Sequence, residues 1–394
     1  MENRTGLFTN AVIWFGVAIS VSEIEAGIQI GSMSAVDSLW VPLVLGHILG
    51  GIMLFFVGLI GARVRLNAME SISSTFGNYG SKFFATLNVA QLLAWVAVLN
   101  AQGAMALMGL NLNVPFYMIC IILAVLIAAW VYVGLQRSSK ITTVVMMVLT
   151  VLLVILSVKL FAGDALSNNV NSGALTFWNI FEISIAMPIS WLPVISDYTK
   201  DVKKPVMATA LSAIAYTIAS LWMYFIGIEV VGLGTTSISQ AILISGLGVQ
   251  GIIILVLSTI TTNFLAANSA GESLKAIFNR VNPKIAGMIV SILSALLAIS
   301  GIMGQYINFL YLIASVFAPM ASVLLVSFYF VKSEGNAKLW YWNIFSWLVG
   351  FVVYQMTVNL DSIFLGPTLL AIIASAIMAY VPGLFSRLHY DVFS

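Results

Sequence analysis

Two carboxylic acids lie inside the first long apolar stretch of the chain, the segment WFGVAISVSEIEAGIQIG. A carboxylate near the centre of a bilayer costs on the order of 3 kcal/mol, so Glu23 and Glu25 need a reason to be there. One alternative is that a neighbouring helix satisfies both acids and that they do nothing else. Because Gly27 and Gly31 also weaken a continuous helix, we favour an unwound segment around residues 22–27 whose carboxylates and free carbonyls line a polar cavity.

A second set of polar side chains follows one face of a later apolar segment. At 100° per residue, Asn88, Gln91, Trp95 and Gln102 fall within about 60° of one another. A tryptophan beside amide side chains suits a flat heterocycle, because the indole stacks on the ring while the amides read its edge. Amides also join helices to one another in membranes, and the sequence does not decide between these two roles.

A third set is rich in hydroxyl groups, in the stretch STITTNFLAANSAGES. Ser258, Thr261 and Thr262 stand at i, i+3 and i+4, which places three oxygens on one helix face. A hard cation such as Na⁺ prefers oxygen ligands, and carbonyls from an unwound neighbour can complete the set. Asn263 and Asn268 add amides. Hydroxyls in membrane helices more often bond back to a carbonyl of the preceding turn, which is the alternative.

The composition places these groups in a polytopic membrane protein. Of 394 residues, 61% are hydrophobic and only 8% are charged, with a mean hydropathy of +1.06. The single Cys120 excludes an internal disulfide or a cysteine metal cluster. Only two histidines exist and His389 lies in the tail, so no histidine metal cluster can form, and we expect His47 to be a packing residue.

Twelve apolar segments are long enough to span a bilayer. Basic residues fall almost entirely in alternate loops, and Lys159 is the exception. This pattern predicts a multi-pass protein of a prokaryotic inner (plasma) membrane with both termini in the cytoplasm. The segments are 10–31, 39–62, 83–107, 115–135, 141–162, 176–196, 206–231, 247–273, 284–303, 306–331, 339–358 and 366–382.

Two of the twelve spans are expected to be broken. Span 1 contains the unwound segment described above, and span 6 carries Pro188 and Pro193 in MPISWLP, where each proline removes a backbone donor. Five spans separate the two breaks, which is the plan of an inverted repeat in secondary transporters. The predicted fold is therefore all-α, with discontinuous helices 1 and 6. We expect one transmembrane domain, 1–394, made of repeats 10–162 and 176–331 and two extra helices in 339–382.

The chain resembles the nucleobase–cation symporter family of the leucine-transporter-like fold, and within it the CytX-like branch of hydroxymethylpyrimidine transporters. The matching stretches extend over the first ten spans. They are WFGVAISVSEI, LGHILGG, IGARVRLNAMESISSTFGNYGS, LNVAQLLAW, SWLPVISDYTK and STITTNFLAANSAGES. The FGNYGS loop and the SDYTK end of span 6, in this order, are the more specific of these motifs.

The resemblance implies a sodium site and a substrate site in the middle of the membrane. Sodium is expected where span 8 meets the break of span 1. The implied sodium ligands are Ser258, Thr261 and Thr262, with carbonyls near Ile19 and Ser22. A flat substrate is expected against Trp95, and the residues implied around it are Gln91, Ser190, Trp191 and Asn268.

Two departures from the family pattern leave alternatives open. Family members often carry a stacking aromatic nearer to Pro188 than Trp191 is. Asn268 is one position away from the polar residue of the family, which makes Asn263 its competitor. Glu23 suits an aminopyrimidine, because a carboxylate accepts a hydrogen bond from an exocyclic amine.

These features predict a secondary active transporter, Na⁺-coupled, that imports a pyrimidine-type heterocycle such as hydroxymethylpyrimidine or cytosine. A proton-coupled carrier of purine, allantoin or hydantoin type is the alternative, and a channel or a membrane enzyme is less favoured because the polar groups form neither rings nor a catalytic cluster. The expected partners are a small heterocycle, Na⁺ or H⁺ and the lipid bilayer. No cofactor beyond the coupling ion and no nucleic acid is expected.

Overall fold

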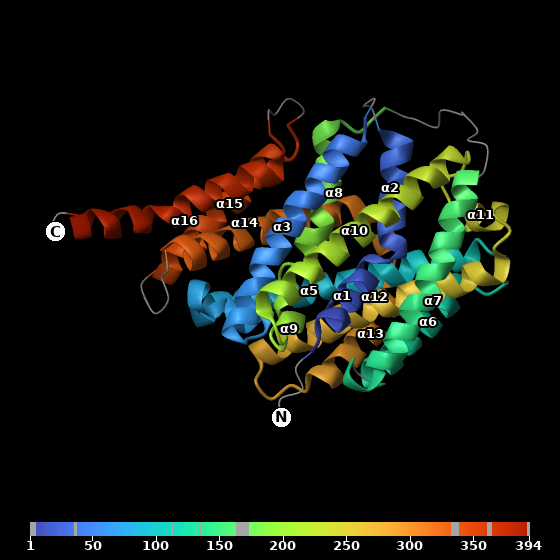
Figure 1. Ribbon diagram of the computed structural model, residues 1–394, viewed down its shortest axis with the longest axis horizontal. Helices are drawn as coiled ribbons and strands as arrows, with labels where there is room; N and C mark the ends of the chain where they lie inside the picture. Colours follow the sequence, from blue (N-terminus) through green and yellow to red (C-terminus); the bar gives the residue numbers. More distant parts are fainter. Residues whose placement is uncertain are drawn as a thin grey trace.

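The computed structural model describes residues 5–34, 38–111, 113–133, 135–162, 173–331, 339–360 and 365–391. Within these ranges the regular structure is entirely helical (Figure 1). The helices are α1 (Leu7–Ala18), α2 (Val21–Met33), α3 (Trp40–Val64), α4 (Ala68–Ser71), α5 (Ser73–Met108), α6 (Phe116–Val133), α7 (Leu135–Ala162), α8 (Phe177–Ser190), α9 (Ile195–Thr199), α10 (Pro205–Gly232), α11 (Ile238–Ile244), α12 (Gly248–Ile277), α13 (Pro283–Ile299), α14 (Tyr306–Val326), α15 (Leu339–Thr357) and α16 (Pro367–Asp391). A 3-10 helix, η1 (Ile302–Gln305), precedes α14, and a π-helical turn, η2 (Ser327–Val331), follows it.

Each of the twelve apolar segments coincides with one helix or with a pair of consecutive helices. Eight of the described helices are long and apolar enough to cross a membrane by themselves, and the bent pair of α1 and α2 makes a ninth. The all-α polytopic class is therefore confirmed, while the count of twelve spans stays a prediction. The short helices α4 and α11 lie between spans and were not foreseen.

Span 1 is broken earlier than the glycines suggested. α1 ends at Ala18, α2 begins at Val21, and the two are bent by 49°. Ser20 caps α2 by accepting a hydrogen bond from the backbone N–H of Glu23 at 3.2 Å. The predicted break at residues 22–27 is wrong by about one turn. Gly27 instead allows close helix packing, since a Cβ there would lie 2.2 Å from the backbone oxygen of Tyr224 in α10.

Span 6 is broken where the two prolines predicted it. α8 contains Pro188 and ends at Ser190, and α9 begins at Ile195, so the break covers residues 191–194. The missing proline N–H groups and the tight turn leave carbonyls free of intrahelical partners at this point. Both discontinuous helices of the expected fold are therefore present.

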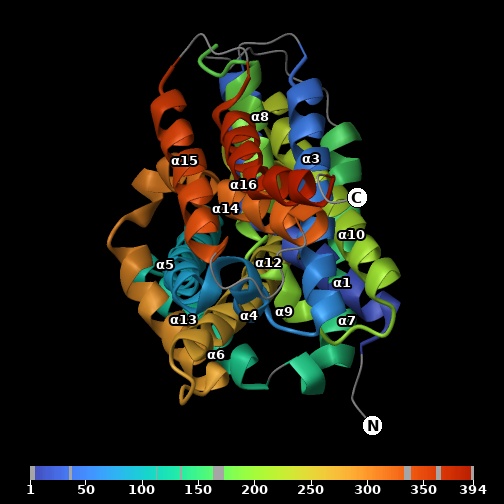
Figure 2. The ribbon, with the colours of Figure 1, turned by 90° about the vertical axis from the view of Figure 1, so that its left-hand side faces the viewer.

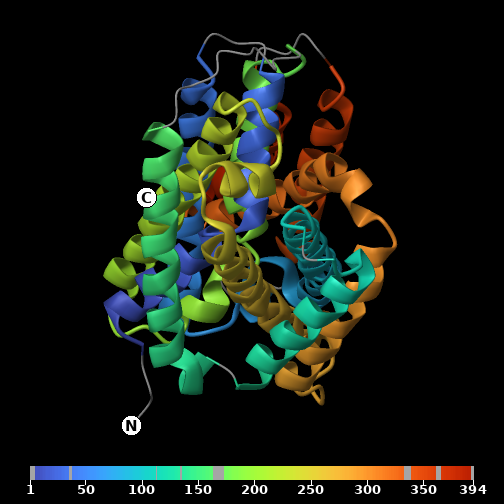
Figure 3. The ribbon, with the colours of Figure 1, turned by 90° about the vertical axis from the view of Figure 1, so that its right-hand side faces the viewer.

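The helices form two packed groups, and the breaks of spans 1 and 6 lie where these groups meet. α1 and α2 pack against α10, and α3 packs against α8 and α10. In the second group α5, α12 and α13 pack on one another, and they lie side by side in Figure 3. α15 and α16 pack on each other and on α14 at the edge of the molecule (Figure 2).

The FGNYGS motif shapes the start of the long helix α5. Gly77 has a φ of +67° and interrupts the helical path there. A side chain at this position would be strained, because this region of φ favours glycine. The ring of Trp340 from α15 also lies within 3.0 Å of where a Cβ would stand. The motif therefore redirects α5 before it enters the membrane and positions its polar face.

Candidate functional site

The hydroxyl of Thr262 in α12 points at the break of span 1. Its Oγ1 donates to the carbonyl oxygens of Val17 at 3.2 Å and Ile19 at 3.4 Å. Thr261 and Ser258 donate to carbonyls of their own helix, and the lone pairs of both oxygens remain available to a cation. Oxygens from two elements thus converge at the break, and Thr262 is the hydroxyl that joins them.

Ser22 lies away from this point, because it is inside α2 rather than in the break. Its hydroxyl is 2.9 Å from the hydroxyl of Tyr306, and its carbonyl accepts from the same hydroxyl at 3.3 Å. Val17 therefore stands where Ser22 was expected, next to Ile19 and Thr262.

A small cavity borders Thr261 on the side of α6 and α7. Its volume of about 10 Å³ is near the minimum that holds one water molecule. The indole N–H of Trp130, which also lines the cavity, has no hydrogen-bond partner among the described residues. An ordered water there would satisfy this donor beside Thr261.

Amide side chains of α5 hold the break of span 6. Gln91 donates to the carbonyl of Ser190 at 3.0 Å and to the side-chain oxygen of Asn88 at 2.8 Å. Asn88 in turn donates to the carbonyl of Pro193 at 3.1 Å and to Ser273 of α12 at 2.8 Å. The two amides therefore satisfy carbonyls that the break leaves free. The side-chain oxygen of Gln91 remains without a partner in the described part of the chain.

Trp95 lies on the same stripe of α5 and is covered by α14. Its ring makes T-shaped contacts with Tyr306, at a centroid distance of 6.4 Å, and with Phe309, at 5.2 Å. Only 5% of the residue is exposed, and its indole N–H has no hydrogen-bond partner among the described residues. A ligand that stacks on Trp95 must therefore displace one of these two rings.

Trp191 belongs to a different aromatic cluster. It contacts Trp14 edge to face at 6.0 Å, and Trp14 also contacts Tyr198 and Tyr216. Among the described ring contacts none joins Trp191 to Trp95, so the two indoles do not face each other in this conformation. The hydroxyl of Ser190 donates to its own helix, at the carbonyl of residue 187.

The two asparagines of α12 differ in what their side chains do. Asn268 donates to the hydroxyl of Tyr198 at 3.3 Å and so belongs to the contact between α12 and α9. Asn263 is fully buried, and neither atom of its amide has a hydrogen-bond partner in the described structure. A buried amide without partners is costly unless a ligand or water pairs with it, which favours Asn263 as the group available for binding.

Glu23 faces α10 rather than α5. Its carboxylate accepts from Tyr216 at 3.1 Å and from Ser220 at 2.9 Å, two residues that share one face of α10. Ser220 is also 2.8 Å from Nε2 of His47, whose Nδ1 is 2.7 Å from the hydroxyl of Ser184. Every residue in this chain of hydrogen bonds is buried. His47 was expected to be a packing residue, and its position as the single histidine inside a span was the signal for this network.

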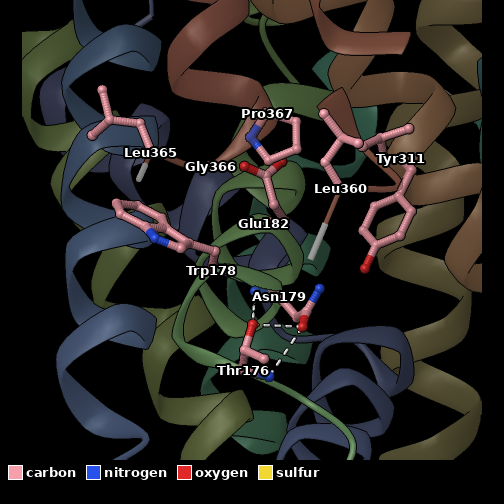
Figure 4. A pocket seen from close by; sticks show the side chains of 10 residues that line it. Thr176, Trp178, Asn179, Glu182, Tyr311, Leu360, Leu365, Gly366 and Pro367 are labelled. Atoms are coloured by element: carbon pink, nitrogen blue, oxygen red, sulfur yellow. Dashed lines mark hydrogen bonds between the residues drawn. The ribbon is translucent and has the colours of Figure 1, made fainter. Parts of the chain in front are cut away.

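A polar cavity of about 60 Å³ lies at the far end of α8 (Figure 4). The buried carboxylate of Glu182 accepts from the backbone N–H of Thr368 at 3.0 Å and from its hydroxyl, and the hydroxyl of Tyr354 lies 3.5 Å away. Thr368 is in the first turn of α16, where a carboxylate stabilises the helix dipole. Sequence reasoning did not single out Glu182, which ties span 6 to the last two spans.

The structure is that of a helical multi-pass membrane protein. Mhp1, a nucleobase-cation-symport-1 family transporter solved in a closed conformation with bromovinylhydantoin bound, superposes with a TM-score of 0.75 at 20% identity, over 97% of this chain and 92% of that one. A Na⁺-coupled sialic acid symporter superposes with a TM-score of 0.73 at 13% identity, over 97% and 90% of the two chains. The leucine-transporter-like fold is thereby confirmed.

The sequence model of the family described as permeases for cytosine/purines, uracil, thiamine and allantoin matches residues 1–374. The protein belongs to this nucleobase:cation symporter family, as its motifs predicted, and it is a permease rather than an enzyme. The hydantoin permease of Microbacterium maritypicum is 24% identical over 97% of this chain and 86% of its own length. The cytosine permease of Escherichia coli K12 is 21% identical over 82% and 78% of the two chains.

Proposed function

We propose that this protein is a Na⁺-coupled carrier that imports a pyrimidine-type heterocycle, such as cytosine or hydroxymethylpyrimidine, by alternating access across the inner membrane of a prokaryote. The observation that carries the proposal is the contact of Thr262 with the carbonyls of Val17 and Ile19. A hydroxyl and two backbone carbonyls at a helix break form an oxygen set of the kind that a hard monovalent cation prefers.

The substrate is proposed to bind against Trp95, with Gln91 and Asn263 as the amides that read its edge. Each of these three side chains is buried and keeps at least one polar atom without a described partner. Relatives named as cytosine and hydantoin permeases support a small ring with N–H and C=O groups on its edge. This set does not include Glu23, Trp191 or Asn268. Their side chains contact Ser220, Trp14 and Tyr198, respectively.

The cation proposal is tested by replacing Thr262 with alanine in proteoliposomes. We expect Thr262→Ala to raise the Na⁺ concentration needed for half-maximal uptake of labelled cytosine by about tenfold. The variant loses one oxygen contact with the cation, and a polar contact with a charged group contributes roughly 1.5–3 kcal/mol to binding. Thr357→Ala is the matched control, because the hydroxyl of Thr357 bonds only within α15. An unchanged Na⁺ dependence in Thr262→Ala at normal protein levels would contradict the site.

A proton-coupled carrier is the second candidate, and the hydrogen-bonded chain from Glu23 to His47 favours it. A serine hydroxyl between a carboxyl group and an imidazole can pass a proton in either direction. Uptake that survives the removal of Na⁺ but stops when a protonophore is added would select this candidate over the first.

A further inference from the structure

Gln102 is a buried amide that no described residue satisfies. It lies on the same stripe of α5 as Trp95, two turns further along the helix, and only 2% of it is exposed. Neither its side-chain oxygen nor its nitrogen has a hydrogen-bond partner in the described structure. Buried polar groups are nearly always paired, so an amide with both ends free indicates a partner that is absent from this conformation.

The side chain of Tyr306 lies beside both Trp95 and Gln102. Its ring contacts the indole of Trp95 at a centroid distance of 6.4 Å, and its hydroxyl pairs with Ser22 of α2. The same hydroxyl lies beside the amide of Gln102. Tyr306 thus presents a six-membered aromatic ring to a tryptophan and the polar substituent of that ring to a serine and a glutamine.

A pyrimidine has the same shape and the same arrangement of groups. Its ring matches the phenol ring in size, and an amine or carbonyl on the ring takes the place of the hydroxyl. Ser22 offers a hydroxyl and a carbonyl, and Gln102 offers a donor and an acceptor side by side, which suits a ring that carries N–H and C=O or N and NH₂ on neighbouring positions.

The position of Tyr306 in the chain allows its side chain to leave. It is the first residue of α14, and it follows the short 3-10 helix η1 and Gly301, whose φ is +92°. No neighbouring atom lies within 4 Å of where a Cβ of Gly301 would stand. A change limited to this first turn would therefore uncover Trp95, Ser22 and Gln102 together.

We propose that Trp95, Ser22 and Gln102 form a subsite for the polar end of a six-membered heterocycle, and that Tyr306 fills this subsite in the empty protein. The proposal rests on the proposed function and adds to it a residue that determines specificity and a side chain that competes with the substrate. Substrate affinity is then reduced by the fraction of molecules in which Tyr306 occupies the site.

Two variants of the purified full-length protein test this, with cytosine binding measured by titration calorimetry. Tyr306→Phe keeps the ring but loses the hydrogen bonds to Ser22, so cytosine should bind about fivefold more tightly. Gln102→Leu keeps the side-chain size but removes both polar atoms, so cytosine should bind about tenfold more weakly. Tyr354→Phe and Gln240→Leu are the matched controls, because these residues contact Glu182 and Thr235 away from Trp95.

An affinity of Tyr306→Phe equal to or weaker than that of the wild type would overturn the proposal, and so would Gln102→Leu binding within about twofold of the wild type. If Gln102→Leu does not fold, as judged by gel filtration, the Tyr306→Phe result decides alone. A wild-type protein that binds none of cytosine, uracil, hydantoin and hydroxymethylpyrimidine would overturn the proposed function itself, and the subsite with it.

Discussion

Glu23 and Glu25 are two positions apart in the sequence but lie on different sides of α2. Glu23 is held by Tyr216 and Ser220 of α10, whereas Ser22, three residues before Glu25, contacts Tyr306 of α14. Residues three apart share a helix face, so Glu25 lies on the side of α14 and α5. The expectation that Glu23 faces the substrate depended on a break placed one turn too late, and Tyr216 and Ser220 engage its carboxylate. Glu25 is the carboxylate on the side of the proposed substrate site.

The two carboxylates should therefore respond differently to substitution. Glu25→Gln loses the charge and one acceptor, and it should weaken binding of an aminopyrimidine while hardly changing the binding of an analogue without the exocyclic amine. Glu23→Gln should leave both affinities close to those of the wild type and lower the thermal stability of the detergent-solubilised protein. A larger loss of affinity in Glu23→Gln than in Glu25→Gln would show that the sequence-based expectation was right.

Trp95 is expected to carry the stacking energy of the bound ring. Trp95→Ala should weaken substrate binding by about 1–3 kcal/mol, by analogy with base–aromatic stacking, and Trp95→Phe should recover part of that loss. Trp222→Ala serves as the control, because Trp222 bonds to Ser157 on the side of α7. If both Trp95 variants bind like the wild type in equilibrium dialysis, Trp95 only packs against Phe309 and Tyr306.

At the scale of helices, hydrophobic length predicted where the spans lie, and two prolines predicted the break in span 6. The glycines of span 1 predict a break too far along the chain, whereas the second half-helix begins earlier, where Ser20 caps it. Gly27 has the opposite role and brings two helices together. A single sequence does not distinguish a glycine that ends a helix from one that permits close packing, because the difference depends on the neighbouring helix.

The packing role of Gly27 leads to a prediction for α2 and α10. Gly27→Ala would place a methyl group 2.2 Å from the backbone oxygen of Tyr224, which must move, and such overpacking costs about 1–3 kcal/mol. We expect a clear fall in the apparent melting temperature of the solubilised protein. Gly232→Ala, at a position with no atom within 4 Å, should melt like the wild type. Equal melting of both variants would mean that α2 and α10 separate easily.

The pairs that build the site were beyond prediction from residue types alone. Thr262 meets Val17 and Ile19 across 245 and 243 positions of sequence, and Gln91 meets Ser190 across 99. The sequence did place Thr262 and Ile19 in the predicted sodium site and Gln91 in the predicted substrate site. It did not show which oxygen faces which carbonyl, because that depends on how two helix groups are rotated against each other.

For the whole molecule, the distribution of basic residues predicts which ends of the helices face the cytoplasm. α10 has Lys203 before its first residue and Thr236 shortly after its last, and both positions are exposed. Cys120 is the single cysteine and is buried, so Cys120→Ser provides a background without thiols. In that background a membrane-impermeant maleimide should label Thr236→Cys on intact cells.

The matched variant Lys203→Cys should react with the maleimide only after the cells are permeabilised. The reverse pattern would place the basic loops outside and would contradict cytoplasmic termini. Labelling of both variants on intact cells would point to leaky cells rather than to topology, and labelling of a cytoplasmic marker protein in the same sample distinguishes that case.

The hydrogen bonds that link Glu23 to His47 determine the net charge that this part of the molecule carries in the electric field of the membrane. The Ser184 hydroxyl donates to the carbonyl of Leu43, so Nδ1 of His47 must donate to Ser184. The single hydrogen of the Ser220 hydroxyl is donated either to Glu23 or to Nε2 of His47. The bond on its other side then needs a hydrogen from the other group, so both bonds form only when one proton resides on either the Glu23 carboxyl group or Nε2 of His47.

The pair is therefore neutral overall whether the proton resides on the carboxyl group or on the imidazole. Spans 1, 2, 6 and 7, which carry the chain, contain no lysine or arginine, so no other cation is available there to balance Glu23. A membrane potential does work of about 2.3 kcal/mol per elementary charge per 100 mV, and it does none on a neutral unit that moves as a whole. A buried acid in this position can thus travel with its helices without making that movement voltage-dependent.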